Sequence, residues 1–284
     1  MAFSDARTTS DQTRSIFATM LNKVPEITIY FWIIKILATT VGETAADYLS
    51  ATLSFGLVTT SYIMGALFLV ALVVQLRTKR YIPTTYWTVV VLISIMGTLI
   101  SDNLVDNLGI SLTTTSAAFA IALIAVFIFW WLSERTLSVH TIVTTKRELF
   151  YWAAILFTFA LGTSAGDLSA EASGLGYVLS ALIFAGMIGV VALAYYAFRI
   201  NGVLAFWIAY ILTRPLGASM GDLLSQPTKL GGLNVGTTVT SVVFITAIVG
   251  MVIYLTISRR DVTEARAKAN APPALAHVEV IAES

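Results

Sequence analysis

Four aspartates recur at a fixed place in the chain, each inside a stretch that is otherwise apolar. Asp47, Asp102, Asp167 and Asp222 each lie five residues after a glycine and fifteen residues after a tryptophan. The glycines are Gly42, Gly97, Gly162 and Gly217, and the tryptophans are Trp32, Trp87, Trp152 and Trp207. The first two copies are 55 residues apart, as are the last two, and 120 residues separate the pairs. Such a period indicates a two-helix unit that was duplicated twice.

Three of the four aspartates have a second acid one helical turn away. The pairs are Glu43 with Asp47, Asp102 with Asp106, and Asp167 with Glu171. In the fourth copy Gln226 stands at this spacing from Asp222. A spacing of four places both carboxyls on one helix face, where like charges repel. In lipid each charge costs at least ~2.5 kcal/mol at the bilayer centre, so these acids need protons, cationic partners or a bound metal ion.

Oxygen ligands of this kind indicate which ions such a site would bind. Carboxylates and hydroxyls suit hard cations such as Mg²⁺, Mn²⁺ or Ca²⁺, and carboxylates that titrate also suit proton coupling. We expect the four repeated aspartates to bind the cation and the three second acids to line the site or its entrance. The alternative is that the acids cap helices or reach water at the membrane surface.

Only two basic residues, Lys35 and Arg214, lie within the apolar segments. Arg214 precedes Asp222 by about two turns, so we expect it to contact at least one of the carboxyls. Lys35 lies about three turns before Asp47, near the end of its segment, and we expect its amine to reach toward the membrane surface.

The composition is that of a membrane protein. Hydrophobic residues make up 57% of the 284 residues and charged residues only 12%, with a mean hydropathy of +0.83, whereas soluble domains have about 25% charged residues. Spans need roughly 20 apolar residues each, and we place eight of them. They are residues 26–50, 54–76, 84–106, 111–133, 148–171, 175–198, 203–226 and 234–257.

We therefore predict an all-α polytopic membrane protein with eight transmembrane helices. The helices form four two-helix parallel repeats in two pseudosymmetric halves, and the first, third, fifth and seventh spans line the interior. The predicted organisation is an arm (1–23), a single transmembrane domain (24–258, with halves 24–133 and 146–258) and a disordered tail (259–284).

Charge predicts the orientation. Of the 17 lysines and arginines, two lie within spans and one, Lys229, lies on one side. The remaining fourteen lie on the other side, which the positive-inside rule makes the cytoplasm. Both termini are then cytoplasmic, and the repeats are parallel and not inverted. Fifteen residues of helix extend roughly 22 Å, so tryptophans near the cytoplasmic surface place the aspartates in the outer half of a core of about 30 Å.

The repeated tryptophans and glycines each have a structural explanation. Indole rings favour the membrane interface, so the tryptophans are expected to form an interfacial belt. The glycines fit either close packing of helices or a helix break that exposes carbonyl oxygens to an ion. Both alternatives for the glycines stay open at this point.

The fourfold aromatic-Trp…Gly…Asp unit, with the opening KVPEITIYFWIIKILATTVGETAADYLS, resembles a family of bacterial inner-membrane proteins built from a repeat of unknown function. Members are often labelled uncharacterised membrane-anchored proteins. The resemblance covers roughly residues 23–257. It implies a bacterial plasma membrane and supplies no activity for any residue.

The chain contains no cysteine, which excludes thiolate metal sites and cysteine nucleophiles. Its two histidines, His140 and His277, fall outside the spans, and the common hydrolase, zinc-protease and phosphate-loop motifs are missing. We expect no enzyme and no nucleic-acid partner. The expected function is a secondary transporter for a cation, with a proton as the candidate coupling ion. The expected partners are the lipid bilayer and the small cation or proton. A passive channel and a non-transporting scaffold or sensor are the alternatives. A homo-oligomer is compatible with the sequence.

Overall fold

A computed structural model describes residues 22–262, apart from the side chains of residues 171 and 172. The predicted arm up to residue 21, the tail from residue 263 and His277 lie outside the described residues. Eight helices in the described part are long and apolar enough to cross a membrane. They are α2 (Ile29–Asp47), α3 (Leu57–Arg77), α4 (Pro83–Asp102), α5 (Leu112–Glu134), α6 (Thr145–Asp167), α7 (Gly176–Phe198), α8 (Gly202–Ser225) and α9 (Thr237–Ser258). The predicted all-α polytopic membrane fold is confirmed.

Short segments of tighter or wider helix join these spans. α2, α4 and α6 each run directly into one π-helical turn, and short 3₁₀ turns follow α5 and α8. The π segments are η1 (Tyr48–Thr52), η2 (Asn103–Asn107) and η4 (Leu168–Ala172), and the 3₁₀ turns are η3 (Val139–Thr141) and η5 (Thr228–Leu230). π-helical turns are rare, and those that occur within α-helices often lie at functional sites. The fourth repeat departs from this pattern, because α8 ends at Ser225 without a π turn.

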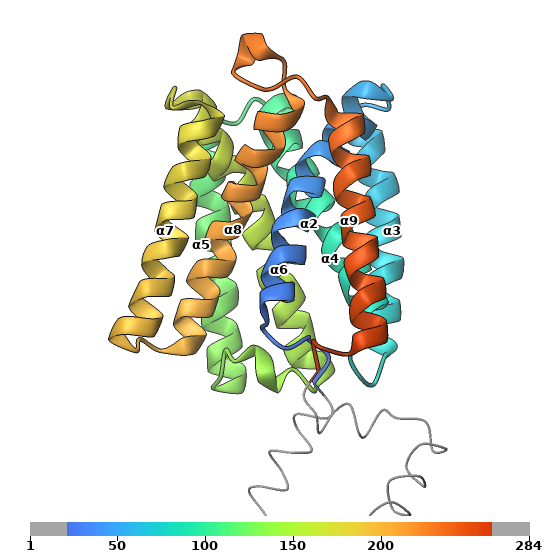
Figure 1. Ribbon diagram of the computed structural model, residues 1–284, viewed down its shortest axis with the longest axis vertical. Coiled ribbons are helices and arrows are strands. Elements are labelled where there is room, and N and C mark those ends of the chain that lie inside the picture. Colours follow the sequence, from blue (N-terminus) through green and yellow to red (C-terminus); the bar gives the residue numbers. More distant parts are fainter. Residues whose placement is uncertain (1–21, 263–284) are drawn as a thin grey trace, which may run out of the picture.

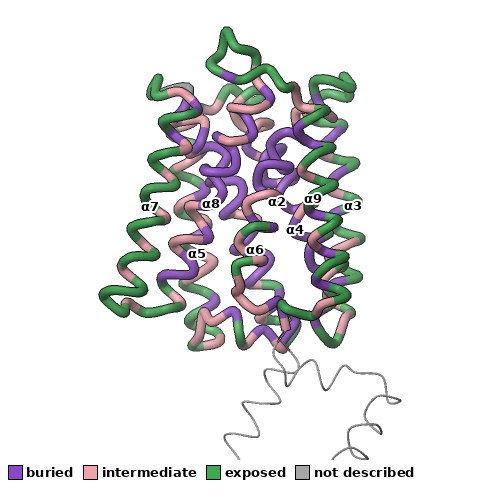
Figure 2. The backbone as a smooth tube through the Cα atoms, viewed as in Figure 1, coloured by how far each residue is buried: buried purple, intermediate pink, exposed green. Residues whose placement is uncertain are grey.

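The eight helices form two layers. α2, α4, α6 and α8 make an inner ring in which half or more of the residues are buried, whereas fewer than a third are buried in each of the others. Figure 2 shows the buried residues concentrated in these inner helices. Around the ring, α2 packs against α4, α4 against α6, α6 against α8, and α8 against α2. The expectation that the odd-numbered spans line the interior is confirmed.

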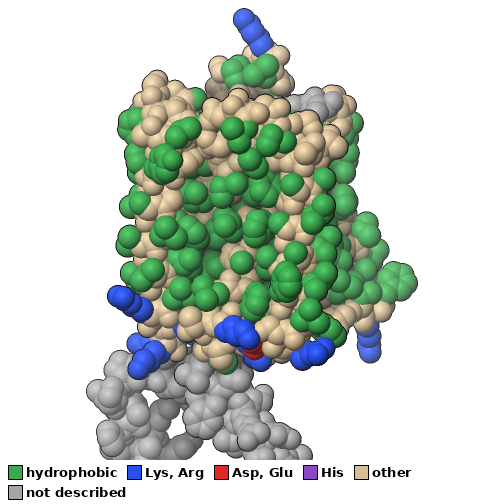
Figure 3. All heavy atoms as spheres, turned by 180° about the vertical axis from the view of Figure 1, so that it is seen from behind, with side chains coloured by type: hydrophobic (Ala, Val, Ile, Leu, Met, Phe, Trp, Pro, Cys, Tyr) green, Lys and Arg blue, Asp and Glu red, His purple; other side chains and the backbone are tan. Residues whose placement is uncertain are grey.

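Each outer helix packs against the inner helix of the following repeat. α3 lies on α4, α5 on α6 and α7 on α8, and α9 at the end of the chain lies on α2 at its beginning (Figure 1). The outer helices are apolar on all sides, as a lipid-facing helix must be. Figure 3 shows apolar side chains over the lateral surface and basic side chains mostly at one end.

The inner helices approach most closely at the repeated glycines. A methyl group on Gly42 or Gly217 would lie 1.9 Å from a side-chain atom of the next inner helix, and on Gly97 or Gly162 it would lie 2.4 or 2.3 Å away. The added methyl would clash with Ser94 at Gly42 and with Phe159 at Gly97. It would clash with Arg214 at Gly162 and with Thr39 at Gly217. Each of these neighbours lies seven residues after the tryptophan of its own repeat. The helices run unbroken through all four glycines, so the glycines serve close packing.

Aromatic side chains close the end of the ring at which the inner helices begin. The residue before each repeated tryptophan packs against the tryptophan of the next inner helix. The ring centroids are 5.7 Å apart for Phe31–Trp87, 5.5 Å for Tyr86–Trp152, 6.2 Å for Tyr151–Trp207 and 5.8 Å for Phe206–Trp32. We call this end of the bundle the aromatic end, and the end at which the inner helices finish the acidic end.

The predicted interfacial belt is wrong for three of the four tryptophans. Trp87, Trp152 and Trp207 are buried, and only Trp32 is half-buried. Their indoles fill the space between inner helices, where stacking and edge-to-face contacts between aromatic rings add to the burial of apolar area.

The aromatic end is further closed by the segment that joins α5 to α6 and by both ends of the described chain. The backbone N–H of Lys23 donates to the Ile142 carbonyl at 3.1 Å, and that of Glu26 donates to the Asp261 carbonyl at 2.9 Å. The Lys23 ammonium forms a buried ion pair with Glu148 at 2.7 Å. Residues from the beginning, the middle and the end of the chain therefore meet below the ring.

Candidate functional site

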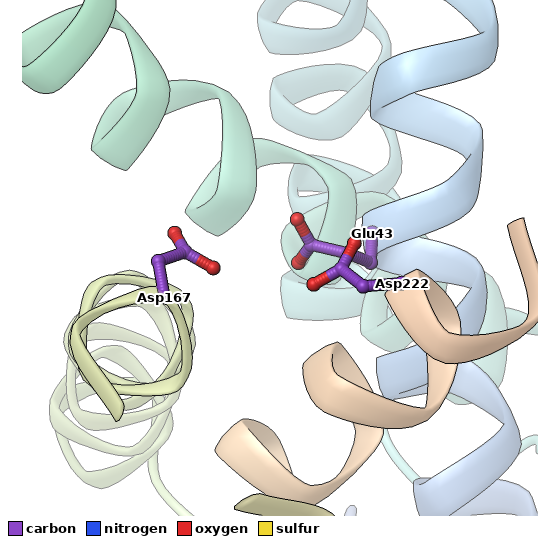
Figure 4. A group of neighbouring side chains, drawn as sticks. All are labelled: Glu43, Asp167 and Asp222. Atoms are coloured by element: carbon purple, nitrogen blue, oxygen red, sulfur yellow. The ribbon is translucent and has the colours of Figure 1, made fainter. Parts of the chain in front are cut away.

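Three carboxyls from three inner helices converge near the acidic end. Glu43 of α2, Asp167 of α6 and Asp222 of α8 each offer an oxygen atom, and these atoms lie within 4.8 Å of one another. Figure 4 shows the three side chains pointing toward a common space. Glu43 and Asp222 are buried and Asp167 is half-buried. We call these three residues the acid trio.

The other predicted acids are placed around this trio. Asp47 is half-buried, and the Gln226 amide donates to its Oδ2 at 3.3 Å. Asp102 is half-buried and interacts electrostatically with Glu43, Asp167 and Asp47. Asp106 is exposed on η2. The side chain of Glu171 lies outside the described residues.

The trio thus differs from the four repeated aspartates that the sequence pattern suggested. Asp167 and Asp222 belong to it, whereas Asp47 and Asp102 do not. Glu43 takes part because it lies eleven residues after its tryptophan, one turn before Asp47. The residues eleven positions after the tryptophan point into the ring, where those of the first three repeats contact Arg214.

Arg214 crosses the ring from α8 and reaches all three other inner helices. One guanidinium nitrogen, Nη1, donates to the Thr39 carbonyl at 2.9 Å. The other, Nη2, donates to Glu43 Oε2 at 3.1 Å and to Thr163 Oγ1 at 2.6 Å, and it also contacts the Thr98 hydroxyl. The side chain is fully buried. The expected contact between Arg214 and a carboxyl is present.

The partners of Nη2 are equivalent residues of the first three repeats. Glu43, Thr98 and Thr163 each lie eleven residues after the repeated tryptophan, and Ala218 holds this position in the fourth repeat. Arg214 itself holds the position of Thr39, Ser94 and Phe159. Four equivalent helices thus surround one guanidinium that only the fourth supplies, which breaks the fourfold equivalence.

Lys35 lies between Arg214 and the aromatic end. It is fully buried, and its ammonium nitrogen lies 4.1 Å from the ring centroid of Tyr210 and 4.4 Å from that of Phe159. Within residues 22–262 this nitrogen has no hydrogen-bond partner, and cation–π contacts take the place of one. The expectation that Lys35 reaches the membrane surface is wrong, because its side chain points into the ring.

The interior of the ring is therefore polar in two ways. Carboxyls lie at the acidic end, and two basic side chains follow toward the aromatic end, where the hydroxyls of Tyr86 and Tyr151 meet at 2.5 Å. Sequence reasoning named the acids and Arg214 but missed the place of Lys35. Aligning the four repeats at the tryptophan would have placed Lys35 and Arg214 one turn apart on neighbouring inner helices.

The chain matches the model of one protein family at four places. The matches cover residues 30–81, 85–136, 150–201 and 205–261, so each contains one inner helix and the outer helix that follows it in the chain. No curated protein and no solved structure matches the chain. The four matches confirm the internal repeats and span well over half of the sequence. The chain therefore belongs to the family described as Repeat of Unknown Function (DUF347).

Proposed function

We propose that the protein is a secondary transporter for a small hard cation, for which Mg²⁺ and Mn²⁺ are the first candidates. The observation that carries this proposal is the acid trio. Three carboxylate oxygens within 4.8 Å of one another, contributed by three membrane-spanning helices, form the oxygen-rich arrangement that divalent hard cations prefer.

Charge balance supports a cationic substrate. Five acids lie toward the acidic end of the inner helices, against the two basic side chains Lys35 and Arg214. The acids are Glu43, Asp47, Asp102, Asp167 and Asp222. Charged side chains within a membrane are costly unless they are neutralised. Protons or a bound cation can supply the missing positive charge, and an exchange between the two would couple transport to a proton gradient.

The filled interior of the ring favours a carrier over a passive channel. A channel needs a continuous pathway whose sites bind weakly enough to release the ion. Here Arg214, Lys35 and the aromatic rings occupy the space between the acid trio and the aromatic end. A carrier can open such a pathway transiently by moving inner helices or side chains, as alternating access requires.

A cation-binding test separates the transporter from a scaffold. We expect Mn²⁺, Mg²⁺ or Ca²⁺ to raise the melting temperature of the purified protein, since a ligand at about 100 times its Kd stabilises the folded state by about 2.7 kcal/mol. Asp167→Asn and Asp222→Asn keep the side-chain shape and remove the charge. They should lose this stabilisation and lose cation flux in proteoliposomes.

Glu134→Gln is the matched control, because Glu134 pairs with Arg147 at the other end of the bundle. It should respond to the cation like the wild type. If both Asp→Asn variants keep full binding and flux, the acid trio is not the cation site. If the wild type shows neither binding nor flux, the protein is a scaffold. We also propose that the protein lies in a bacterial plasma membrane with both termini in the cytoplasm, as its charge distribution indicates.

A further inference from the structure

The fourth repeat places a cation where the other repeats place oxygen atoms. Glu43, Thr98 and Thr163 are equivalent in the first three repeats, and each presents an oxygen to the same nitrogen of Arg214. The Thr39 carbonyl adds a fourth oxygen at the second nitrogen. A carboxylate, two hydroxyls and a carbonyl resemble the ligand set of a hard metal ion, but here they surround a guanidinium.

Glu43 belongs to this cage and to the acid trio at once. Its Oε2 atom accepts from Arg214 at 3.1 Å, and its carboxyl lies within 4.8 Å of the ligand oxygens of Asp167 and Asp222. The guanidinium is therefore directly next to the proposed cation site, on the side of the aromatic end. Any cation that leaves the trio in that direction meets it first.

The guanidinium cannot step aside by losing its proton. Arginine stays charged in proteins, so Arg214 opposes a passing cation both by its volume and by its charge. Its stem is confined as well, because Gly162 packs against it so closely that an added methyl would lie 2.3 Å from Cγ. A cation can pass only if the guanidinium leaves its oxygen partners.

One donor of Arg214 is not satisfied in this arrangement. The Nε atom is buried and has no hydrogen-bond partner within the described part of the chain. A buried donor without a partner is unfavourable, which sets this guanidinium apart from one that is fully fixed by its surroundings. If the guanidinium moves, its Nε–H can gain a hydrogen-bond acceptor that it lacks in this position.

We infer that Arg214 is the gate of the cation pathway, a tethered cation that blocks passage between the acid trio and the aromatic end. This inference rests on the proposed transport function. The gate opens when Glu43 exchanges the guanidinium for the transported cation, and it closes when the guanidinium returns to Glu43, Thr98 and Thr163. The arginine thereby couples occupancy of the trio to closure of the pathway.

Passive leak of Mn²⁺ into proteoliposomes that contain a quenchable dye tests the gate. With no proton gradient imposed, Arg214→Gln should raise the non-saturable Mn²⁺ influx at least tenfold over the wild type. Arg214→Lys keeps the charge but cannot bridge three helices with one fork, so its leak should be intermediate. Arg147→Gln, which removes a guanidinium paired with Glu134 at 2.8 Å, should leak no more than the wild type.

Folding is checked for each variant by elution profile and melting temperature. If Arg214→Gln does not fold, the double variant Thr98→Val/Thr163→Val removes two partners of the guanidinium at nearly constant volume. Its control is Thr158→Val, a buried threonine of α6 without a hydrogen-bond partner in residues 22–262. The double variant should leak and the control should not.

The outcomes separate this inference from the proposed function. A folded Arg214→Gln variant, or a folded double variant, that stays as tight as the wild type overturns the gate. A wild-type protein that neither binds nor transports any of the tested cations overturns the transport function instead. If the wild type shows gradient-driven cation flux and Arg214→Gln also shows a passive leak, both the transport function and the gate are supported.

Discussion

Arg214 is the one charged residue at its position of the repeat, and it alone connects the four inner helices through one side chain. Threonine, serine and phenylalanine fill this position in the other repeats, and none of them can reach across the ring as arginine does. A buried ion pair such as Arg214–Glu43 contributes little net stability once desolvation is counted. We expect this ion pair to define one arrangement of the helices and to add little to the free energy of unfolding.

The repeated glycines give a prediction at the scale of single atoms. In Gly217→Ala the new methyl would lie 1.9 Å from Thr39 Oγ1 and 3.2 Å from the Thr39 backbone carbon. α2 and α8 would have to separate, and overpacking of this kind typically costs about 1–3 kcal/mol. We expect a lower melting temperature in detergent.

Gly186→Ala is the control for this change. Gly186 lies on the outer helix α7, and no atom lies within 4 Å of the position of an added methyl. Alanine favours a helix over glycine by about 0.8–1.0 kcal/mol, so this variant should match or exceed the stability of the wild type. Equal stability of the Gly217 and Gly186 variants would contradict the close-packing role of the repeated glycine.

At the scale of elements, the sequence predicted the helices and their layers well. Every predicted span begins and ends within three residues of the observed one, because an apolar run of membrane length leaves few alternatives. The inner helices were identified because they carry the acids, and they are also the less apolar ones. The acid trio was predicted in part: Asp167 and Asp222 followed from the repeat, and Glu43 was expected only at the margin.

What the sequence did not reveal depends on contacts between helices. An outer helix that is apolar on all sides carries no sign of which inner helix it covers, so the packing of α3 on α4 could not be read from it. The π turns after Asp47, Asp102 and Asp167 were not predicted. The tryptophans were predicted at the membrane interface because indole rings favour it. Indole rings also pack well between buried helices, and only the packing of the inner helices decides between these two places.

The contact between the α3–α4 loop and the end of α9 gives a prediction for these elements. The Tyr81 hydroxyl donates to Asp261 Oδ2 at 2.5 Å, and both residues are buried. Burial, and then the charge of Asp261, raise the pKa of the Tyr81 hydroxyl well above its usual range. Tyr81→Phe removes the donor to a buried carboxylate, which should cost about 1–3 kcal/mol in the free energy of unfolding.

The pH dependence of this loss has a definite sign. Because the folded pKa of Tyr81 is raised, its contribution is complete below the ordinary tyrosine pKa of about 10 and declines as the pH rises above that value. The stability difference between wild type and Tyr81→Phe should thus be constant through neutral pH. Tyr62→Phe, at an exposed tyrosine of α3, should show no difference, and an equal effect of both changes would contradict the role of the Asp261 contact.

For the whole molecule, the distribution of basic residues predicts the orientation in the membrane. In residues 22–262 the basic side chains outside the spans lie at the aromatic end, except Lys229 in η5. The positive-inside rule then predicts that the aromatic end lies in the cytoplasm. The native chain has no cysteine, so single cysteines can report on this directly.

Leu230→Cys, at an exposed residue next to Lys229, should react with a membrane-impermeant maleimide on intact cells. Arg199→Cys, at the opposite end of the bundle, should react only after the membrane is permeabilised. The reverse pattern would contradict the orientation, and labelling of both positions on intact cells would contradict the membrane crossing.

The packing of α9 on α2 has a consequence for biogenesis. Among the eight described spans, the first, α2, is covered by the last, α9, so we expect the ring of helices to stay open while the earlier spans are inserted. Until α9 is inserted, we expect the flank of α2 that α9 covers to lack this cover, including the Thr44 hydroxyl that accepts from Ser241 at 2.8 Å. We therefore expect the ring to close only when α9 is inserted, and a chain truncated before α9 to expose the flank of α2 that α9 covers in the structure.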